Sequence, residues 1–140
     1  MKLYFYHKAE KMLIEPNKYN VLVVEDETDL REILVFILQD IGYNVSEAVN
    51  GEEALKMCQT NSYDAIISDI RMPKVDGVQL LKSLRSINPE IPLIFLVTGF
   101  ADIKEAECYK LGANAFINKP YDVTEMTDKL EKSLSELIKK

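Results

Sequence analysis

The segment Asp64-Ala65-Ile66-Ile67-Ser68-Asp69-Ile70-Arg71-Met72-Pro73 decides the fold that we predict for this chain. Its apolar residues are typical of a buried strand, and the pattern ends abruptly at Asp69, just before a proline-containing turn. In an open parallel sheet, ligands bind just beyond the carboxyl ends of the strands. The position of Asp69 therefore predicts a carboxylate that acts on a ligand, although an isolated aspartate in a turn more often has only a capping role.

Composition limits the kind of protein that this chain forms. Its 140 residues are enough for one domain with a hydrophobic core. No apolar run approaches the roughly 20 residues of a membrane helix, and the first residues lack a secretory signal, so we expect a soluble, cytoplasmic protein without membrane contact. A net charge of −6 argues against direct nucleic-acid binding through phosphates.

Histidine and cysteine usage excludes several kinds of site. His7 is the only histidine, which excludes a Ser-His-Asp triad or a histidine-based metal site in the core. Cys58 and Cys108 lie far apart in the sequence and have no partner at metal-ligand spacing. We expect both to be small, buried or half-buried side chains with free thiols.

Strand and helix patterns alternate from residue 20 to the end of the chain. Strands are predicted at residues 20–24, 44–49, 64–69, 91–97 and 115–117, and each is followed by a helix, the last two at about 101–111 and 122–138. Repeated strand–helix units with short connections predict a parallel sheet with right-handed crossovers. The predicted fold is α/β, a flavodoxin-like doubly wound five-stranded parallel sheet with strand order 2-1-3-4-5 and five helices.

Two further expectations concern the first 42 residues of the printed sequence. Residues 1–19 are interpreted as an N-terminal extension, a solvated arm that precedes a domain at residues 20–140, because a Pro-Asn turn lies at their boundary. In the first helix, apolar residues recur at spacings of three and four before Gly42, which predicts an inward face. That predicted face consists of Leu30, Ile33, Leu34, Ile37, Leu38 and Ile41.

Polar side chains follow four of the five predicted strands. Glu25 and Asp26 follow the first, Asp69 ends the third, Thr98 the fourth and Lys119 the fifth. Because parallel strands end at the same edge of a sheet, all five side chains should meet there. Three carboxylates that repel one another normally hold a cation, and oxygen ligands favour Mg²⁺ or Mn²⁺. With a lysine and a hydroxyl beside them, such a site suits phosphoryl transfer to Asp69.

These motifs resemble the receiver domain of two-component response regulators. The resemblance covers about residues 20–138 and depends on VLVVEDE, AIISDIRMP, DGVQLL, LVTG and FINKP in that order. It implies a phosphoprotein that takes a phosphoryl group from a phospho-histidine donor in a Mg²⁺-dependent reaction of two-component or phosphorelay signalling. The nearest type is a chemotaxis-regulator-like receiver, either a natural single-domain protein or one excised from a larger regulator. It would not be a conventional enzyme, since it catalyses only its own phosphorylation and slow dephosphorylation.

The resemblance also implies a role for each site residue. Asp69 would be the phospho-acceptor, with Asp26 and Asp69 as direct Mg²⁺ ligands. Glu25 would act mainly through water, and the backbone carbonyl of Arg71 would be a further ligand. Thr98 and Lys119 would contact the phosphoryl oxygens, and the Lys119–Pro120 bond would be cis.

The resemblance also implies a switch at two positions, and two other residues bear on the lifetime of the phosphorylated state. Thr98 and Phe116 would form the switch, with Phe116 turning inward on phosphorylation. The surface of the fourth helix, fifth strand and fifth helix would then control an unknown output protein or effector domain. The phosphoryl donor would be a sensor histidine kinase or a histidine phosphotransfer protein. Arg71 and Phe100 lack a group that orients water and would flank its approach to the phosphoryl group, which predicts slow dephosphorylation.

Two other classes of protein remain open from the residues alone. A phosphatase of the haloacid-dehalogenase type also forms an aspartyl-phosphate, but it needs an aspartate where this chain has Arg71. A flavodoxin-like binding module needs a glycine- and hydroxyl-rich phosphate loop, whereas Glu25-Asp26-Glu27 would repel a phosphate in the absence of a metal.

Overall fold

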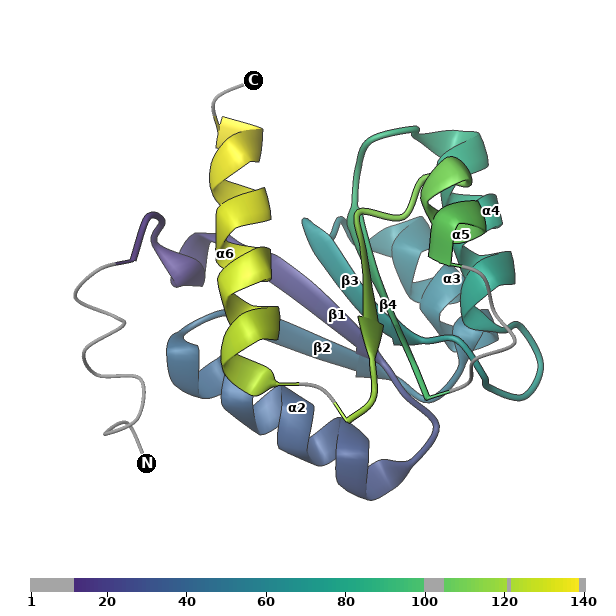
Figure 1. The fold of residues 1–140 in the computed structure, drawn as a ribbon, viewed down its shortest axis with the longest axis horizontal. Helices are drawn as coiled ribbons and strands as arrows, with labels where there is room; N and C mark the ends of the chain where they lie inside the picture. Colours follow the sequence, from purple (N-terminus) through teal and green to yellow (C-terminus); the bar gives the residue numbers. More distant parts are fainter. Residues whose placement is uncertain (1–11, 100–104, 121, 139–140) are drawn as a thin grey trace.

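The fold is a central parallel sheet between two layers of helices (Figure 1). The structure is a computed structural model, and it describes residues 12–99, 105–120 and 122–138. The strands are β1 (Asn20–Val24), β2 (Asn44–Ala48), β3 (Ala65–Asp69), β4 (Leu93–Thr98) and β5 (Ala115–Asn118). All neighbouring strands pair in parallel in the order β2-β1-β3-β4-β5, which confirms the predicted topology.

Five α-helices and one short 3-10 helix connect and flank these strands in the described residues. They are η1 (Pro16–Lys18), α2 (Thr28–Ile41), α3 (Gly51–Thr60), α4 (Gly77–Ile87), α5 (Glu105–Lys110) and α6 (Val123–Ile138). Helices α3, α4 and α5 lie together on one side of the sheet, and α2 and α6 lie on the other (Figure 1). The fourth and fifth predicted helices therefore correspond to α5 and α6.

Each face of the sheet has its own hydrophobic core. One core joins Val21 and Phe95 to Leu38 of α2 and Leu130 of α6. The other packs alternate residues of the same strands, such as Leu22, against α3, α4 and α5. Because both faces are covered, β3 and β4 are buried along their whole length and read as continuous apolar runs, whereas the edge strand β2 is mostly accessible.

The inward face of α2 differs from the face predicted from its apolar spacing. Arg31, Leu34, Val35 and Leu38 are buried, whereas Ile33 is 56% exposed. The prediction of Ile33 was therefore wrong, and Arg31 takes the place of an apolar residue at the start of the buried stripe. Residues 33–38 are all apolar, so periodicity alone does not fix which side of this helix faces the sheet.

Residues 12–19 pack against the domain. Ile14 and Tyr19 are buried in the core between the sheet, α2 and α6. The backbone N–H of Leu13 donates a 2.6 Å hydrogen bond to Oε2 of Glu131 on α6. The interpretation of this region as a solvated arm is therefore wrong for residues 12–19, because two of its side chains complete the core. The division of the chain at residue 20 stays a prediction.

Two remaining expectations concern the cysteines and membranes. Cys58 on α3 is half-buried and Cys108 on α5 is buried, and both thiols are free, as predicted. Within the described ranges, no helix is both long and apolar enough to span a bilayer.

Candidate functional site

Three carboxylates meet at the carboxyl end of the sheet. Asp69 is the last residue of β3, and Glu25 and Asp26 directly follow β1 on the neighbouring strand. One carboxylate oxygen from each residue lies within 4.8 Å of the other two. This is the convergence that the shared edge of parallel strands predicts.

Lys119 supplies the positive charge at this cluster. Its Nζ lies 3.4 Å from Oδ2 of Asp69 and 3.4 Å from Oε1 of Glu25. The backbone N–H of Lys119 donates a 2.7 Å hydrogen bond to the carbonyl of Thr98, which fastens the end of β5 to the end of β4. The Lys119–Pro120 bond is cis, as the resemblance implied.

Burial makes the negative charges of this site costly. Glu25 is 7% exposed and Asp69 8%, whereas Asp26 is exposed. Loss of solvation raises the pKa of the Asp69 carboxyl, and the attraction of Lys119 only partly opposes it. Burial likewise raises the pKa of Glu25, despite the hydrogen bond from the Glu27 N–H. Burial lowers the pKa of Lys119, but attraction to Asp69 and Glu25 outweighs this effect and leaves that pKa raised.

The residues present fit a hard divalent cation. The three carboxylates carry more charge than the neighbouring ammonium of Lys119, and two of them are buried with raised pKa values. Carboxylate oxygens are the ligands that Mg²⁺ or Mn²⁺ prefers. A cation bound here would relieve both the repulsion among the acids and their desolvation.

The turn after β3 is fixed by its backbone. Ile70 N–H donates to Oδ1 of Asp69 at 3.0 Å, and Gly77 N–H donates to the carbonyl of Ile70 at 2.9 Å. A methyl group at Gly77 would lie 2.5 Å from the Asp69 carbonyl oxygen, so only glycine allows α4 to begin this close to the end of β3. Asp76 and Gln79 form a capping box that fixes the start of α4.

The remaining predicted site residues have different placements. Thr98 is fully buried at the end of β4, next to β5. Arg71 is exposed just beyond Asp69. Phe100 lies outside the described residues. The lifetime roles of Arg71 and Phe100 stay predictions.

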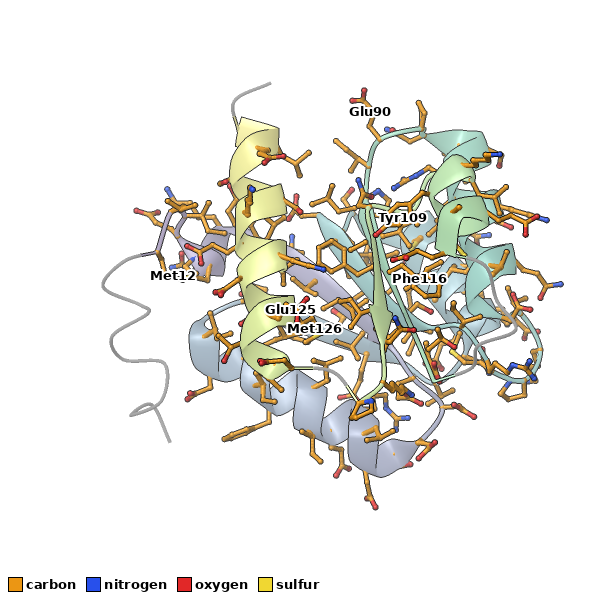
Figure 2. All side chains as sticks on the ribbon, in the orientation of Figure 1. Met12, Glu90, Tyr109, Phe116, Glu125 and Met126 are labelled. Carbon is orange, nitrogen blue, oxygen red and sulfur yellow. The ribbon has the colours of Figure 1, made fainter. Side chains whose placement is uncertain are left out.

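Phe116 is already buried in this structure. It is 6% exposed on β5 and packs in the core on the α3–α5 side of the sheet. Its backbone N–H donates a 3.1 Å hydrogen bond to the hydroxyl of Tyr109 on α5, and the two side chains lie close together in Figure 2. The switch role of Phe116 stays a prediction.

Sequence analysis did not single out Arg31, which lies behind the acidic cluster. Its Nη1 donates a 2.8 Å hydrogen bond to the backbone carbonyl of Glu25, and its Nε lies 2.9 Å from Oε1 of Glu47 on β2. The only sequence signal was its spacing of three, four and seven residues from Leu34, Val35 and Leu38.

The fold and site define an α/β domain with a cluster of three carboxylates and an adjacent lysine at the carboxyl edge of its sheet. The profile of the response regulator receiver domain family matches residues 21–131. The transcriptional regulatory protein ZraR of Salmonella typhimurium is 35% identical over 119 residues, which cover 84% of this chain and 27% of ZraR. The chain belongs to the response regulator receiver domain family.

Solved structures agree with this assignment. The CheY-like receiver domain protein from Methanospirillum hungatei has a TM-score of 0.81 and 27% identity, over 86% of this chain and 97% of that one. The response regulator TrrA from Thermotoga maritima, in complex with Mg²⁺-BeF, has a TM-score of 0.74 and 32% identity, over 82% and 98% of the two chains. The chain spans about a quarter to a half of the length of the curated relatives it matches. Family membership favours the receiver over the phosphatase and flavodoxin-like alternatives.

Proposed function

We propose that Asp69 accepts a phosphoryl group from a phospho-histidine donor in a Mg²⁺-dependent reaction. The observation that carries this proposal is the position of Asp69, at the end of a buried strand, within the acidic cluster and 3.4 Å from Lys119. A carboxylate in this place is surrounded by groups that suit a transferring phosphoryl group. The chain would act as a signalling domain of a two-component system.

The reaction has a simple balance. An oxygen of the Asp69 carboxylate attacks the phosphorus, a P–O bond forms, and the P–N bond to the donor histidine breaks. The donor ring, protonated on its other nitrogen, keeps the electron pair of the broken bond and leaves as neutral imidazole. Lys119, and Thr98 from the adjacent strand end, would bind phosphoryl oxygens. Glu25, Asp26, Asp69 and the Arg71 carbonyl would hold Mg²⁺, which supplies neutralisation of the charge that collects on the phosphoryl oxygens.

The same metal is supported by a solved relative. TrrA, 32% identical to this chain, was crystallised in complex with Mg²⁺-BeF. In this chain, three carboxylate oxygens within 4.8 Å of one another provide ligands of the type that such an ion needs. We infer that Mg²⁺ binding and phosphorylation occur at one site.

We infer a histidine-containing donor and a separate output partner or domain. The only histidine among these 140 residues is His7, and it belongs to no predicted helix, so the donor histidine would belong to a sensor histidine kinase or a histidine phosphotransfer protein. The output would pass through the α5–β5–α6 surface, because Lys119 directly follows β5 and Phe116 lies within it. A partner protein or an effector domain would bind this surface.

Acetyl phosphate and Mg²⁺ test the proposal without knowledge of the kinase. Intact-mass measurement should show one added phosphoryl group on the wild-type chain and none on Asp69→Asn. Asp64→Asn is the matched control, because Asp64 directly precedes β3, at the end of the strand opposite to Asp69. An adduct that persists in Asp69→Asn, or one that His7→Ala removes, would overturn the assignment, and rapid turnover without an adduct would favour a phosphatase.

A further inference from the structure

Arg31 is a buried cation beside the acidic cluster. Its side chain is 11% exposed, although arginine is seldom buried without partners that compensate for lost hydration. Helix α2 places it at the start of the buried stripe, where Leu34 and Val35 follow. Because burial of this charge is unfavourable, the contacts of the guanidinium indicate its role.

The contacts of Arg31 join three elements. Nη1 donates to the Glu25 carbonyl at 2.8 Å, and Nε pairs with Oε1 of Glu47 at 2.9 Å. The Glu25 carbonyl belongs to the peptide unit that links Glu25 to Asp26. Arg31 therefore holds the backbone between two of the three carboxylates and ties it to β2 through Glu47.

Besides the bond from the guanidinium, within the part of the chain that the structure describes, Lys119 Nζ contacts the Glu25 carboxylate at 3.4 Å, and the other hydrogen bonds to this loop have backbone N–H donors. Glu25 N–H donates to the Ala48 carbonyl at 3.2 Å, and Glu27 N–H donates to Oε2 of Glu25 at 3.0 Å. These bonds hold the Glu25 N–H and the Glu25 carboxylate. They do not involve the Glu25 carbonyl, which belongs to the peptide unit that orients Asp26. The guanidinium of Arg31 donates a hydrogen bond to the carbonyl of that peptide unit.

We propose that Arg31 is a positioning residue for the divalent-cation site, which it orders by fixing the Glu25–Asp26 peptide unit. The inference rests on the proposed function, because it assumes that the acidic cluster binds Mg²⁺. The proposal predicts that removal of Arg31 weakens Mg²⁺ binding, whereas removal of a positive charge alone would strengthen it. A nearby positive charge by itself weakens the binding of a divalent cation, whereas a clamp on the ligand-bearing loop strengthens it.

Mg²⁺ titration by calorimetry on the whole chain separates these effects. Arg31→Met, which keeps the length of the side chain but removes its charge and donors, should raise the Mg²⁺ Kd about tenfold. Arg31→Lys keeps the charge but has one donor group for two separated acceptors. Its Kd should therefore lie between those of the wild type and Arg31→Met. Glu47→Gln should raise the Kd less than Arg31→Met, because the bond to Glu25 remains. These milder variants keep the inference testable if Arg31→Met does not fold.

Arg85→Met is the matched control for stability. Arg85 is a half-buried arginine on α4 that also donates to a backbone carbonyl, that of Gly112, at 2.9 Å. Urea unfolding should show a loss of stability in both Met variants, but only Arg31→Met should change the Kd. A lower Kd in Arg31→Met would mean that charge dominates, and an unchanged Kd would mean a purely structural role; either result overturns the inference. If the wild-type chain binds no Mg²⁺, the proposed metal site fails and the inference fails with it.

Discussion

The carboxylates of Glu25 and Asp69 are buried at the site. Burial raises the pKa of Asp69 above its ordinary value of 3.8 and that of Glu25 above 4.5. A carboxyl whose pKa is higher in the folded than in the unfolded chain binds protons more tightly when folded. In metal-free protein, each therefore contributes stability at low pH and loses it as the pH rises through the folded-state pKa.

The first prediction is that Asp69→Asn becomes progressively more stabilising as the pH rises. With EDTA present, the variant should gain little at pH values below the ordinary carboxyl range, where Asp69 is protonated in both states. Above the raised pKa, the gain should reach its full value, because wild type then carries an unfavourable buried charge. Urea unfolding across pH, with Asp64→Asn as control, measures this difference.

Millimolar Mg²⁺ should reverse the order of stability at neutral pH. A cation that binds only the folded chain stabilises it by mass action, and Asp69→Asn removes one of its ligands. A difference between the two proteins that stays constant with pH, or wild-type stability that does not respond to Mg²⁺, would contradict the prediction.

At the scale of elements, the segment that precedes β1 supports α6. Ile14 is 8% exposed and packs in the core between the sheet, α2 and α6, whereas its neighbour Leu13 is 67% exposed. We expect Ile14→Ala to lower the free energy of unfolding by about 2 kcal/mol, because it leaves a cavity in that core. Leu13→Ala should change it by less than about 0.5 kcal/mol. Urea denaturation of the two variants makes the comparison, and equal losses would show that residues 12–19 do not pack as described.

The second element-scale prediction concerns α5, β5 and α6. The hydrogen bond from the Phe116 N–H to the Tyr109 hydroxyl joins β5 to α5, and Lys119 directly follows β5. We expect amide exchange to change in all three elements when Asp69 is phosphorylated, as a shift between two populated states. Asp69→Asn treated with acetyl phosphate should show no change. Changes confined to the loops around Asp69 would argue against this output surface.

At the scale of the whole molecule, the two free cysteines lie on different helices of the same layer. Cys58 lies on α3 and Cys108 on α5, and α3, α4 and α5 share one side of the sheet (Figure 1). Burial raises the pKa of both thiols, which lowers the fraction of reactive thiolate. We expect slow labelling of the native protein by a thiol reagent, with half-buried Cys58 reacting before Cys108.

Peptide mapping after partial labelling identifies which thiol reacts first. Titration of the unfolded protein without reductant should count two thiols per chain. A count of zero in a monomer, or faster labelling of Cys108, would contradict the layer order described here.

The sequence by itself determined the sheet and the convergence at its edge. Continuous apolar runs indicated strands covered on both faces, and helices between them allowed only parallel pairing with right-handed crossovers. Parallel strands all end at one edge, so Glu25, Asp69 and Lys119 had to meet there whatever the packing of the helices. The composition of the site therefore follows from which residues end each strand, and the sequence shows those residues directly.

Only the tertiary structure decided how the helices and the N-terminal segment pack against that sheet. Helix α2 has six consecutive apolar residues, so several of its faces have nearly equal hydrophobic content. The ion pair of Arg31 with Glu47 and its hydrogen bond to the Glu25 carbonyl favour the face that buries Arg31. Ile14 lies in a segment too short to show any period, and its burial depends on the groove that α2, α6 and the sheet form together. Phe116 is likewise buried because α5 packs beside it. These outcomes depend on contacts between residues distant in sequence, which no local pattern of side chains specifies.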